Sequence, residues 1–296
     1  MSLLSNNLLV GAGTDGYQIS RSLRFNSADS AYLNRTPGAG GGITKGVISA
    51  WIKRSGLGTS QSIIQARQDA NNQQYIGFTT NDTIEVGITA AGTTTLSKVT
   101  SAVYRDCSAW YHIFFYQDNT LATAEDRYQL YVNGVRVTAW GTNINTAPQS
   151  TSTYLGTSNP HYIGAYNAVG GYYSGYITEY HFVYQPTTVP TVSDFGETDT
   201  ITGVWKPKKY TGAYGANGFY LNFSDNSGTT STTLGKDSSG NGNNWTPNNF
   251  SVTAGASNDS MIDTPTPYAD GGNGRGNYCT LNPLDIYAGS LSNGNL

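Results

Sequence analysis

Short segments rich in aromatic and β-branched residues recur along this chain, and clusters of Gly, Asn, Ser and Thr separate them. The clearest case is residues 130–137, where Asn133 and Gly134 stand between two alternating apolar runs. Both residues tolerate a positive φ, so this dipeptide is a strong signal of a tight β-hairpin. Helical periodicity is nearly absent from the 296 residues. The pattern therefore predicts an all-β fold, either a sandwich or a barrel.

The predicted strands differ in how many of their faces are apolar. Residues 47–53 place Ile48, Ala50 and Ile52 on one face and Trp51 on the other. Residues 110–116 are apolar on both faces, which indicates a central strand. Strands that are apolar on both faces imply sheets covered on both faces, as in a jelly roll. Further strands are predicted at residues 22–26, 75–78, 83–88, 162–164, 175–184 and 218–223.

The composition excludes two kinds of binding partner for this chain, nucleic acids and the membrane interior. Charged residues make up 12% of the chain, about half the usual share, while tyrosine alone counts 22. The surface is therefore polar through hydroxyl and amide groups rather than through ions. The net charge is −3 and no run of Lys or Arg is present, so we expect no nucleic-acid binding. Because no segment approaches the roughly 18 apolar residues of a membrane helix, we expect no membrane insertion.

Five pieces of sequence follow one another in a family-like order. They read Ser-Leu-Arg-Phe-Asn at 22–26, Ile-Ser-Ala-Trp-Ile-Lys at 48–53, Trp-Tyr-His-Ile at 110–113, the hairpin at 130–137, and Tyr-Ile-Gly at 162–164 with Gly-Tyr-Ile-Thr-Glu at 175–179. Together they resemble the LamG/pentraxin-type branch of the concanavalin A-like lectin superfamily. The resemblance implies a jelly-roll sandwich of two antiparallel sheets at residues 20–223, with an arm at 1–19 before it and a Gly/Asn-rich arm at 224–296 after it.

One departure from that pattern concerns the order of the strands. Many LamG-like domains carry, before their opening strand, a segment similar to Tyr-Leu-Asn-Phe-Ser-Asp and Asp-Ser-Ser-Gly-Asn-Gly-Asn; here both stretches come late, at 220–225 and 237–243. Residues 220–244 therefore either complete the jelly roll in circularly permuted order or begin a second, incomplete domain. We favour the first interpretation, because a lone terminal strand would leave its edge unpaired.

The whole chain also resembles LamG-containing structural proteins of marine tailed phages, through the stretches at 243–250 and 277–284. This resemblance implies a virion protein made in the host cytoplasm, either a tail fibre or a receptor-binding attachment protein with a glycan-binding domain. A capsid decoration or head-fibre protein with a purely structural role is the alternative. In such a protein, residues 224–296 form either an ordered arm or a linker to a missing domain.

The C-terminal arm motivates a prediction about assembly. Ordering a Gly/Asn-rich chain costs about 1–2 kcal/mol of backbone entropy per residue, and the arm contains few apolar anchors, such as Trp245 and Phe250. We therefore expect the arm to pack on a neighbouring subunit or another virion protein. By analogy with phage fibres, the expected assembly is a homo-oligomer, most simply a trimer.

We expect no enzymatic activity. The superfamily also contains β-glucanases, whose catalytic strand resembles Glu-x-Asp-x-x-Glu. The nearest match here is Glu197-Thr198-Asp199, and no Glu follows at the required spacing, while Glu179 stands alone on its predicted strand. Glycoside hydrolysis remains a remote alternative. Cys107 and Cys279 are expected to be free thiols, with a disulfide between them as the alternative.

Two sets of residues are candidates for ligand binding. Tyrosines and amides in predicted loops suit a glycan, because rings stack on sugar C–H surfaces and amides orient the hydroxyls. These residues are Tyr154, Tyr166, Asn167, Tyr172 and Tyr173. A contact between subunits is the alternative role for them. The second set, Asp225, Asp237 and Asn241, offers oxygen ligands for Ca²⁺, because related domains often bind calcium in loops; simple turn capping is the alternative.

Overall fold

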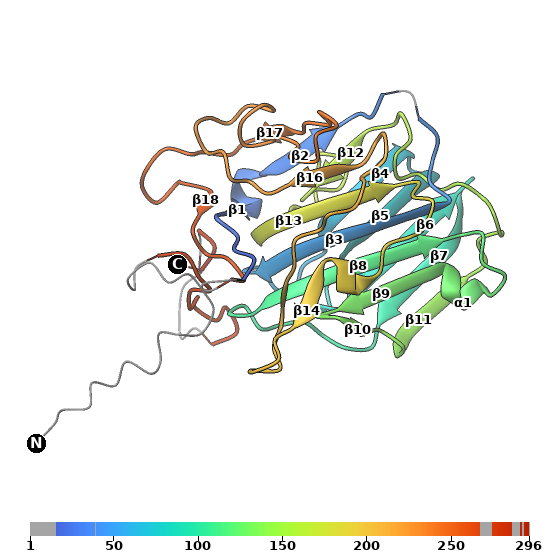
Figure 1. The fold of residues 1–296 in the computed structure, drawn as a ribbon, viewed down its shortest axis with the longest axis horizontal. Helices are drawn as coiled ribbons and strands as arrows, with labels where there is room; N and C mark the ends of the chain where they lie inside the picture. The colour runs from blue at the N-terminus through green and yellow to red at the C-terminus, as the bar shows by residue number, and fades with distance from the viewer. Residues whose placement is uncertain (1–15, 39, 267–273, 286–290, 292, 296) are drawn as a thin grey trace, which may run out of the picture.

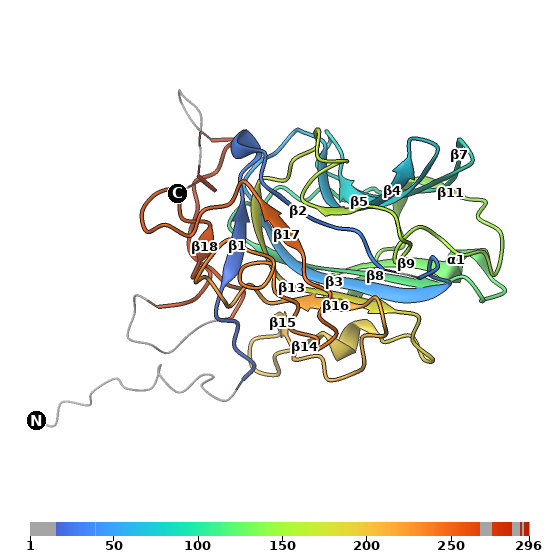
Figure 2. The same cartoon turned by 90° about the horizontal axis from the view of Figure 1, so that it is seen from above.

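The computed structural model describes residues 16–38, 40–266, 274–285, 291 and 293–295. Two large antiparallel sheets face each other, and a small sheet of β14 (Gly196–Thr198) and β15 (Trp205–Pro207) lies outside them (Figures 1 and 2). Helical structure is limited to α1 (Ala124–Arg127) and two 3-10 turns, Ser27–Asp29 and Val192–Asp194, within the described residues. The predicted all-β jelly-roll fold is confirmed.

Each large sheet mixes strands from distant parts of the chain. In spatial order the first sheet runs through β10 (Val135–Arg136), β9 (Tyr128–Val132), β8 (Trp110–Asp118), β3 (Lys45–Arg54), β13 (Gly175–Tyr184), β1 (Ser22–Phe25) and β18 (Ser260–Met261), and its eighth strand, β16 (Phe219–Leu221), also pairs with β13. The second consists of β11 (Trp140–Asn145), β7 (Thr93–Thr100), β6 (Ile84–Ala90), β5 (Asn72–Phe78), β4 (Gln61–Asp69), β12 (His161–Ile163), β2 (Tyr32–Arg35) and β17 (Thr246–Asn248).

The core lies between the two sheets and follows the alternation of the strands. Ile48, Ala50 and Ile52 of β3 point into it, and Trp51 points the other way, toward Trp110 and Tyr176. At the predicted hairpin, Asn133 has φ 50° and Gly134 has φ 79°, and the turn joins β9 to β10. Both predictions are confirmed, because side-chain alternation and positive-φ residues are local properties that the sequence displays directly.

The outer face of the first sheet is covered. Residues 185–214 cross it, and Phe195 packs there on Val47, Phe114 and Val183. Figure 2 shows β14 and β15 on the side of the first sheet that faces away from the second. On the second sheet the outward-facing tyrosines of β2, β5 and β12 keep partial exposure. The expectation that both sheets are covered on both faces was therefore wrong for the second sheet, whose outer residues include partly exposed tyrosines and polar side chains.

The segment after residue 218 packs on its own sandwich. Strand β16 pairs with β13 on the same side as β1, so it joins the first sheet as a strand. Strand β17 pairs with β2, and β18 pairs with β1. Trp245 is fully buried in the core. The expectation that this arm packs on a neighbouring subunit was wrong for its described residues.

Buried ion pairs explain that error, because the entropy argument counted apolar anchors alone. Arg24 pairs with Asp259 at 3.0 Å, and Lys53 pairs with Asp263 at 2.8 Å. All four side chains are at most 5% exposed. The sandwich thus contributes two buried cations, and the arm contributes the two carboxylates that neutralise them. Order in the arm comes from contacts with its own domain.

Two further expectations concern the cysteines and the membrane. Cys107 is buried and Cys279 is exposed, and both are free thiols. No helix in the described part of the chain is long and apolar enough to cross a membrane. Residues 1–15 of the expected N-terminal arm lie outside the described residues, and the part that follows includes the buried Ile19.

Candidate functional site

Five partly exposed tyrosines gather on the outer face of the second sheet. Tyr32 lies on β2, Tyr75 on β5 and Tyr162 on β12, while Tyr166 and Tyr172 come from the loop that follows β12. The ring centroids of Tyr32 lie 6.3 Å from those of Tyr162 and Tyr172, and those of Tyr75 and Tyr166 are 5.9 Å apart. We call these five residues the tyrosine face.

Strand register places the tyrosine face in line. Tyr162 is the direct partner of Gln65 on β4, and Gln65 is the partner of Tyr75. On its other side Tyr162 pairs with Asn34 of β2. Residues directly opposite each other in neighbouring strands point to the same face. A row of alternating amide and phenol side chains therefore runs across four strands.

Glycines on the same face allow the rings to lie close to the sheet. Gly87 is the cross-strand partner of Tyr75, and a Cβ at Gly87 would come within 2.3 Å of the Tyr75 ring. A Cβ at Gly77 would lie 2.6 Å from the Tyr166 hydroxyl. Glycine in a strand weakens it and marks close approach of another group. The two glycines thus support rings that lie flat on the backbone.

A polar groove of about 320 Å³ opens between these rings. Tyr75 and Ser97 donate hydrogen bonds to Oε1 of Glu85, at 3.0 and 3.2 Å. Burial and the Glu85 carboxylate raise the pKa of Tyr75, and burial raises the pKa of Tyr166 to about 12, so both are neutral phenols. The complete lining is Ser60, Gln65, Arg67, Gln73, Tyr75, Glu85 and Tyr166.

Amide and guanidinium groups supply the remaining polarity of the groove. Nε2 of Gln65 donates to Oε1 of Gln73 at 2.8 Å, which orients both amides along the sheet. Arg67 makes no hydrogen bond or ion pair through its side chain with another described residue. The groove therefore presents donors, acceptors and ring faces together.

The five residues predicted as a glycan site separate in the structure. Tyr166 and Tyr172 lie on the tyrosine face, and Asn167 is in the same loop with φ 52°. Tyr154 instead packs against the core and donates to Asn72. Tyr173 is fully buried, contacts Phe25 edge to face, and donates to the backbone oxygen of Lys53. Tyr173 was therefore a wrong prediction, because a core residue cannot reach a ligand.

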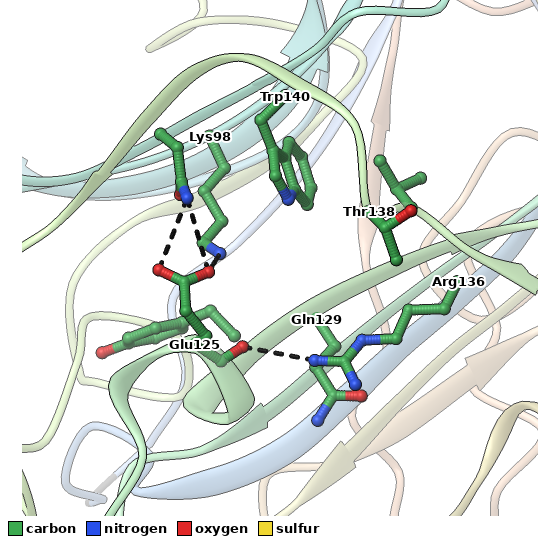
Figure 3. Close-up of a pocket in the computed structure, with 9 residues that line it drawn as sticks. Lys98, Glu125, Gln129, Arg136, Thr138 and Trp140 are labelled. Atoms are coloured by element: carbon green, nitrogen blue, oxygen red, sulfur yellow. Dashed lines mark hydrogen bonds and ion pairs between the residues drawn. The ribbon is translucent and has the colours of Figure 1, made fainter.

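A second concave region lies between the edges of the two sheets. Figure 3 shows this pocket of about 350 Å³, where Lys98 and Trp140 of the second sheet face Gln129 and Arg136 of the first. The Lys98 ammonium is 2.7 Å from the Glu125 carboxylate of α1 and 5.0 Å from the centre of the Trp140 ring. The hydrogen bond from Lys98 lowers the pKa of Glu125. The charges in this pocket are therefore already matched to one another.

The residues predicted to bind calcium close turns. Both oxygens of Asp237 accept hydrogen bonds, from the backbone of Tyr220 and Ser239, the Ser239 hydroxyl and the backbone of Asn243. Asn241 donates to two backbone carbonyls, and Asp225 accepts from Ser227. Among the described residues no group of three or more His, Cys, Asp or Glu side chains is arranged to hold a metal ion. Calcium binding stays a prediction.

Comparisons with solved structures find several similar chains at low sequence identity. A heptameric SAP-like pentraxin from Limulus polyphemus is 14% identical, with TM-score 0.39, over 57% of this chain and 78% of its own. Domain 4 of an extracellular arabinanase from Geobacillus stearothermophilus, in complex with arabinotriose, is 18% identical, with TM-score 0.41, over 57% and 76%. A CBM40 of a Ruminococcus gnavus sialidase, bound to sialyllactose, is 14% identical, with TM-score 0.33, over 55% and 86%.

Sequence comparison identifies the family. No curated protein matches the chain. A family model described as the concanavalin A-like lectin/glucanases superfamily matches residues 25–193, which is more than half of the chain. This span begins in β1 and includes the whole tyrosine face. With its lectin-like sandwich of two antiparallel sheets, the chain belongs to the concanavalin A-like lectin/glucanases superfamily.

Proposed function

We propose that the tyrosine face binds a glycan. The observation that carries this proposal is the row of phenol rings and amides on the outer face of the second sheet, which the described segments leave partly exposed. Sugar rings present C–H surfaces that stack on aromatic rings and hydroxyls that need directed polar partners. Tyr162 and Tyr75 supply the stacking rings, and the partly exposed Gln73 supplies a polar group that the buried Gln65 orients. A saccharide chain lying across the strands contacts both rings.

The proposed role is attachment. The resemblance to LamG-containing structural proteins of marine tailed phages, through residues 243–250 and 277–284, supports a virion protein at a tail fibre or receptor-binding tip. In that role the tyrosine face meets a glycan on the host surface. A capsid decoration or head-fibre protein, in which the same tyrosines contact other virion proteins, is the competing proposal.

A glycan array probed with the full chain tests the binding proposal. We expect binding to at least one bacterial surface glycan, and Tyr75→Ala and Tyr162→Ala should each weaken it about tenfold, since an aromatic contact contributes up to about 1.5 kcal/mol and about 1.4 kcal/mol is tenfold. Tyr131→Ala, which removes a partly exposed tyrosine from β9 of the other sheet, is the matched control and should leave Kd unchanged. Absence of binding across the array, with the tyrosine face buried in assembled particles, would establish the structural role instead.

We also propose that binding occurs without hydrolysis. Glycosidases of the usual kind need two carboxyl groups flanking the scissile bond. The groove is lined by one carboxylate, Glu85, and Oε1 of that group is already hydrogen-bonded to Tyr75 and Ser97. Incubation with the bound glycan should release no reducing sugar. Release that Glu85→Gln abolishes would contradict this.

Homo-oligomerisation remains a proposal without support from the arm, since the described part of that arm packs on its own domain. Several large hydrophobic side chains are nevertheless exposed; Ile201 and Val204 on the turn between β14 and β15 are 86% and 61% exposed. Light scattering on the purified chain should report a trimer. A monomer would leave the virion partner, rather than a second copy, as the group that covers this turn.

A further inference from the structure

Four side chains with oxygen or nitrogen donor atoms converge on the covered outer face of the first sheet. The Tyr17 hydroxyl is 2.5 Å from Oε2 of Glu179 and 2.8 Å from the hydroxyl of Tyr220. The Tyr220 hydroxyl is 2.6 Å from Oε1 of Glu179. Nε2 of His181 is 3.5 Å from Oε2 of Glu179. Glu179 and His181 are each 3% exposed, so the polar cluster is buried.

An irregularity of β13 brings Glu179 into this cluster. Its pairing with β3 shifts register between Thr178 and His181, and Glu179 adopts φ +49°. Bulges of this kind redirect a side chain, and a left-handed non-glycine residue is strained. After the bulge, Tyr180 enters the core and His181 points outward. The strand therefore departs from regular pairing at the residue that carries the carboxylate.

The neighbours of His181 hold its ring in one orientation. Nδ1 lies 2.8 Å from the Tyr214 hydroxyl, and the ring stacks on Tyr220 at 4.3 Å and 6°. The opposite nitrogen, Nε2, is thereby directed at the Glu179 carboxylate. Histidines that bind metals are commonly oriented in this way, with the second ring nitrogen engaged by an outer partner.

We propose that Tyr17, Glu179, His181 and Tyr220 form a binding site for a trivalent hard metal ion, with Fe³⁺ as the biological candidate. Two phenolates and one carboxylate carry three negative charges, which a trivalent ion neutralises, and neutrality matters because an uncompensated charge is costly in a buried site. Anionic oxygen ligands suit hard cations, and imidazole suits iron. A divalent ion reaches neutrality with Glu179 and one phenolate, so only a trivalent ion uses both tyrosines as anionic ligands.

The protonation of the cluster gives the binding event a signature. The hydroxyls of Tyr17 and Tyr220 each donate a hydrogen bond to the Glu179 carboxylate, so both are phenols in the absence of a metal. Binding of Fe³⁺ converts each O–H into an Fe–O bond and releases two protons to solvent. Phenolates bound to Fe³⁺ absorb visible light by charge transfer, which neither the free ion nor the phenols do comparably.

Titration of the full chain with ferric nitrilotriacetate tests the site. We expect a visible absorption band that saturates at one equivalent of iron. Tyr17→Phe and Tyr220→Phe should each abolish or strongly reduce it. Tyr210→Phe is the matched control, because Tyr210 packs beside His181 but its hydroxyl bonds only to the backbone of Ala213 among the described residues, and this variant should keep the full band.

A second readout follows from the partial exposure of Tyr17. Bound iron should immobilise Tyr17 and slow chymotryptic cleavage after this residue at least tenfold. Tyr220→Phe should remove this protection. A wild-type chain with neither band nor protection overturns the site. Zinc sulfate that protects Tyr17 when ferric ion does not overturns the assignment of a trivalent ion. The proposal is independent of glycan binding, which neither outcome affects.

Discussion

The first sheet turns its outer face toward residues 185–214, whereas the second sheet leaves its outer face partly exposed. On the covered face, His112 stacks between Trp51 and Trp205 and accepts a hydrogen bond from the Trp205 indole. On the open face, tyrosines stand beside glutamines and an arginine. Both faces are rich in aromatic residues, so aromatic content alone does not separate a covered face from a binding face.

What separates the two faces is the chemistry between the rings. The covered face fills the space with Trp, Phe and Val and closes on buried polar networks. The open face fills it with amides and leaves glycine under the rings. Substitutions on the covered face should therefore act on stability, and substitutions on the open face should act on binding.

Deleting residues 251–296 should produce the largest effect. The deletion removes Asp259 and Asp263, which are the buried ion-pair partners of Arg24 and Lys53. Breaking a buried pair costs about 3–5 kcal/mol, so two such losses approach the 5–15 kcal/mol that stabilise a typical domain. We expect the truncated protein to lose its cooperative unfolding transition in thermal and denaturant melts.

A matched pair of single substitutions sharpens that result. Asp263→Asn should lower the free energy of unfolding by several kcal/mol, because Lys53 is 0% exposed and the Trp110 indole also donates to this carboxylate. Asp126→Asn breaks the exposed pair with Arg136 and should cost less than about 1 kcal/mol. A truncated chain with an unchanged melting temperature would show that the arm belongs to an interface instead.

Local sequence patterns predicted the fold, but they did not predict which segment covers each surface. Asn133-Gly134 and the alternation in β3 predicted a hairpin and an inward face, and both are properties of neighbouring residues. The arm was different. Lys53 and Asp263 are far apart in sequence, so no local pattern indicates that they pair. A polar, Gly-rich segment has the same composition whether it covers its own domain or another one. Entropy arguments therefore cannot choose between these two partners.

The candidate site shows the same division between local and distant information. Tyr172 and Tyr173 are neighbours in a loop, yet one is partly exposed and the other is fully buried. Loop residues lack a fixed period, so the sequence does not distinguish them. Tyr32, Tyr75 and Tyr162 were missed because they lie in strands. Their signal was present: each precedes an inward Leu or Ile, which places the tyrosine outward.

Low pH should lower the free energy of unfolding without changing glycan binding at the open face. Burial lowers the pKa of His112 to about 3 and that of His161 to about 4, from 6.5. Their neutral forms stabilise the fold fully above pH 6.5. As the pH falls, the unfolded chain binds these protons first, so stability drops between pH 6.5 and 4, by up to about 3 kcal/mol for each group.

Denaturant melts at several pH values measure this effect. His161→Gln should make the free energy of unfolding depend less on pH, even if this variant is less stable at every pH. The chain has three histidines, and all of them are buried away from the tyrosine face. Glycan affinity should therefore stay constant from pH 8 to 5.5 while stability declines. Affinity that follows the stability curve would mean that binding depends on the covered face as well.

The smallest predicted effect on stability tests the open face most directly. Gly87→Ala adds a methyl group 2.3 Å from the Tyr75 ring, which must swing away from the sheet. Alanine is favoured over glycine in a strand by about 0.5–1 kcal/mol, which offsets part of the clash, so the melting temperature should hardly change. The displaced ring should nevertheless cost about tenfold in glycan Kd. Gly141→Ala on β11 of the same sheet is the control, because there the new methyl group approaches nothing closer than 3.7 Å, and both Kd and melting temperature should match the wild type. Equal affinity in the two variants would mean that Tyr75 does not bind the sugar, and the open face would then be a surface for protein contact.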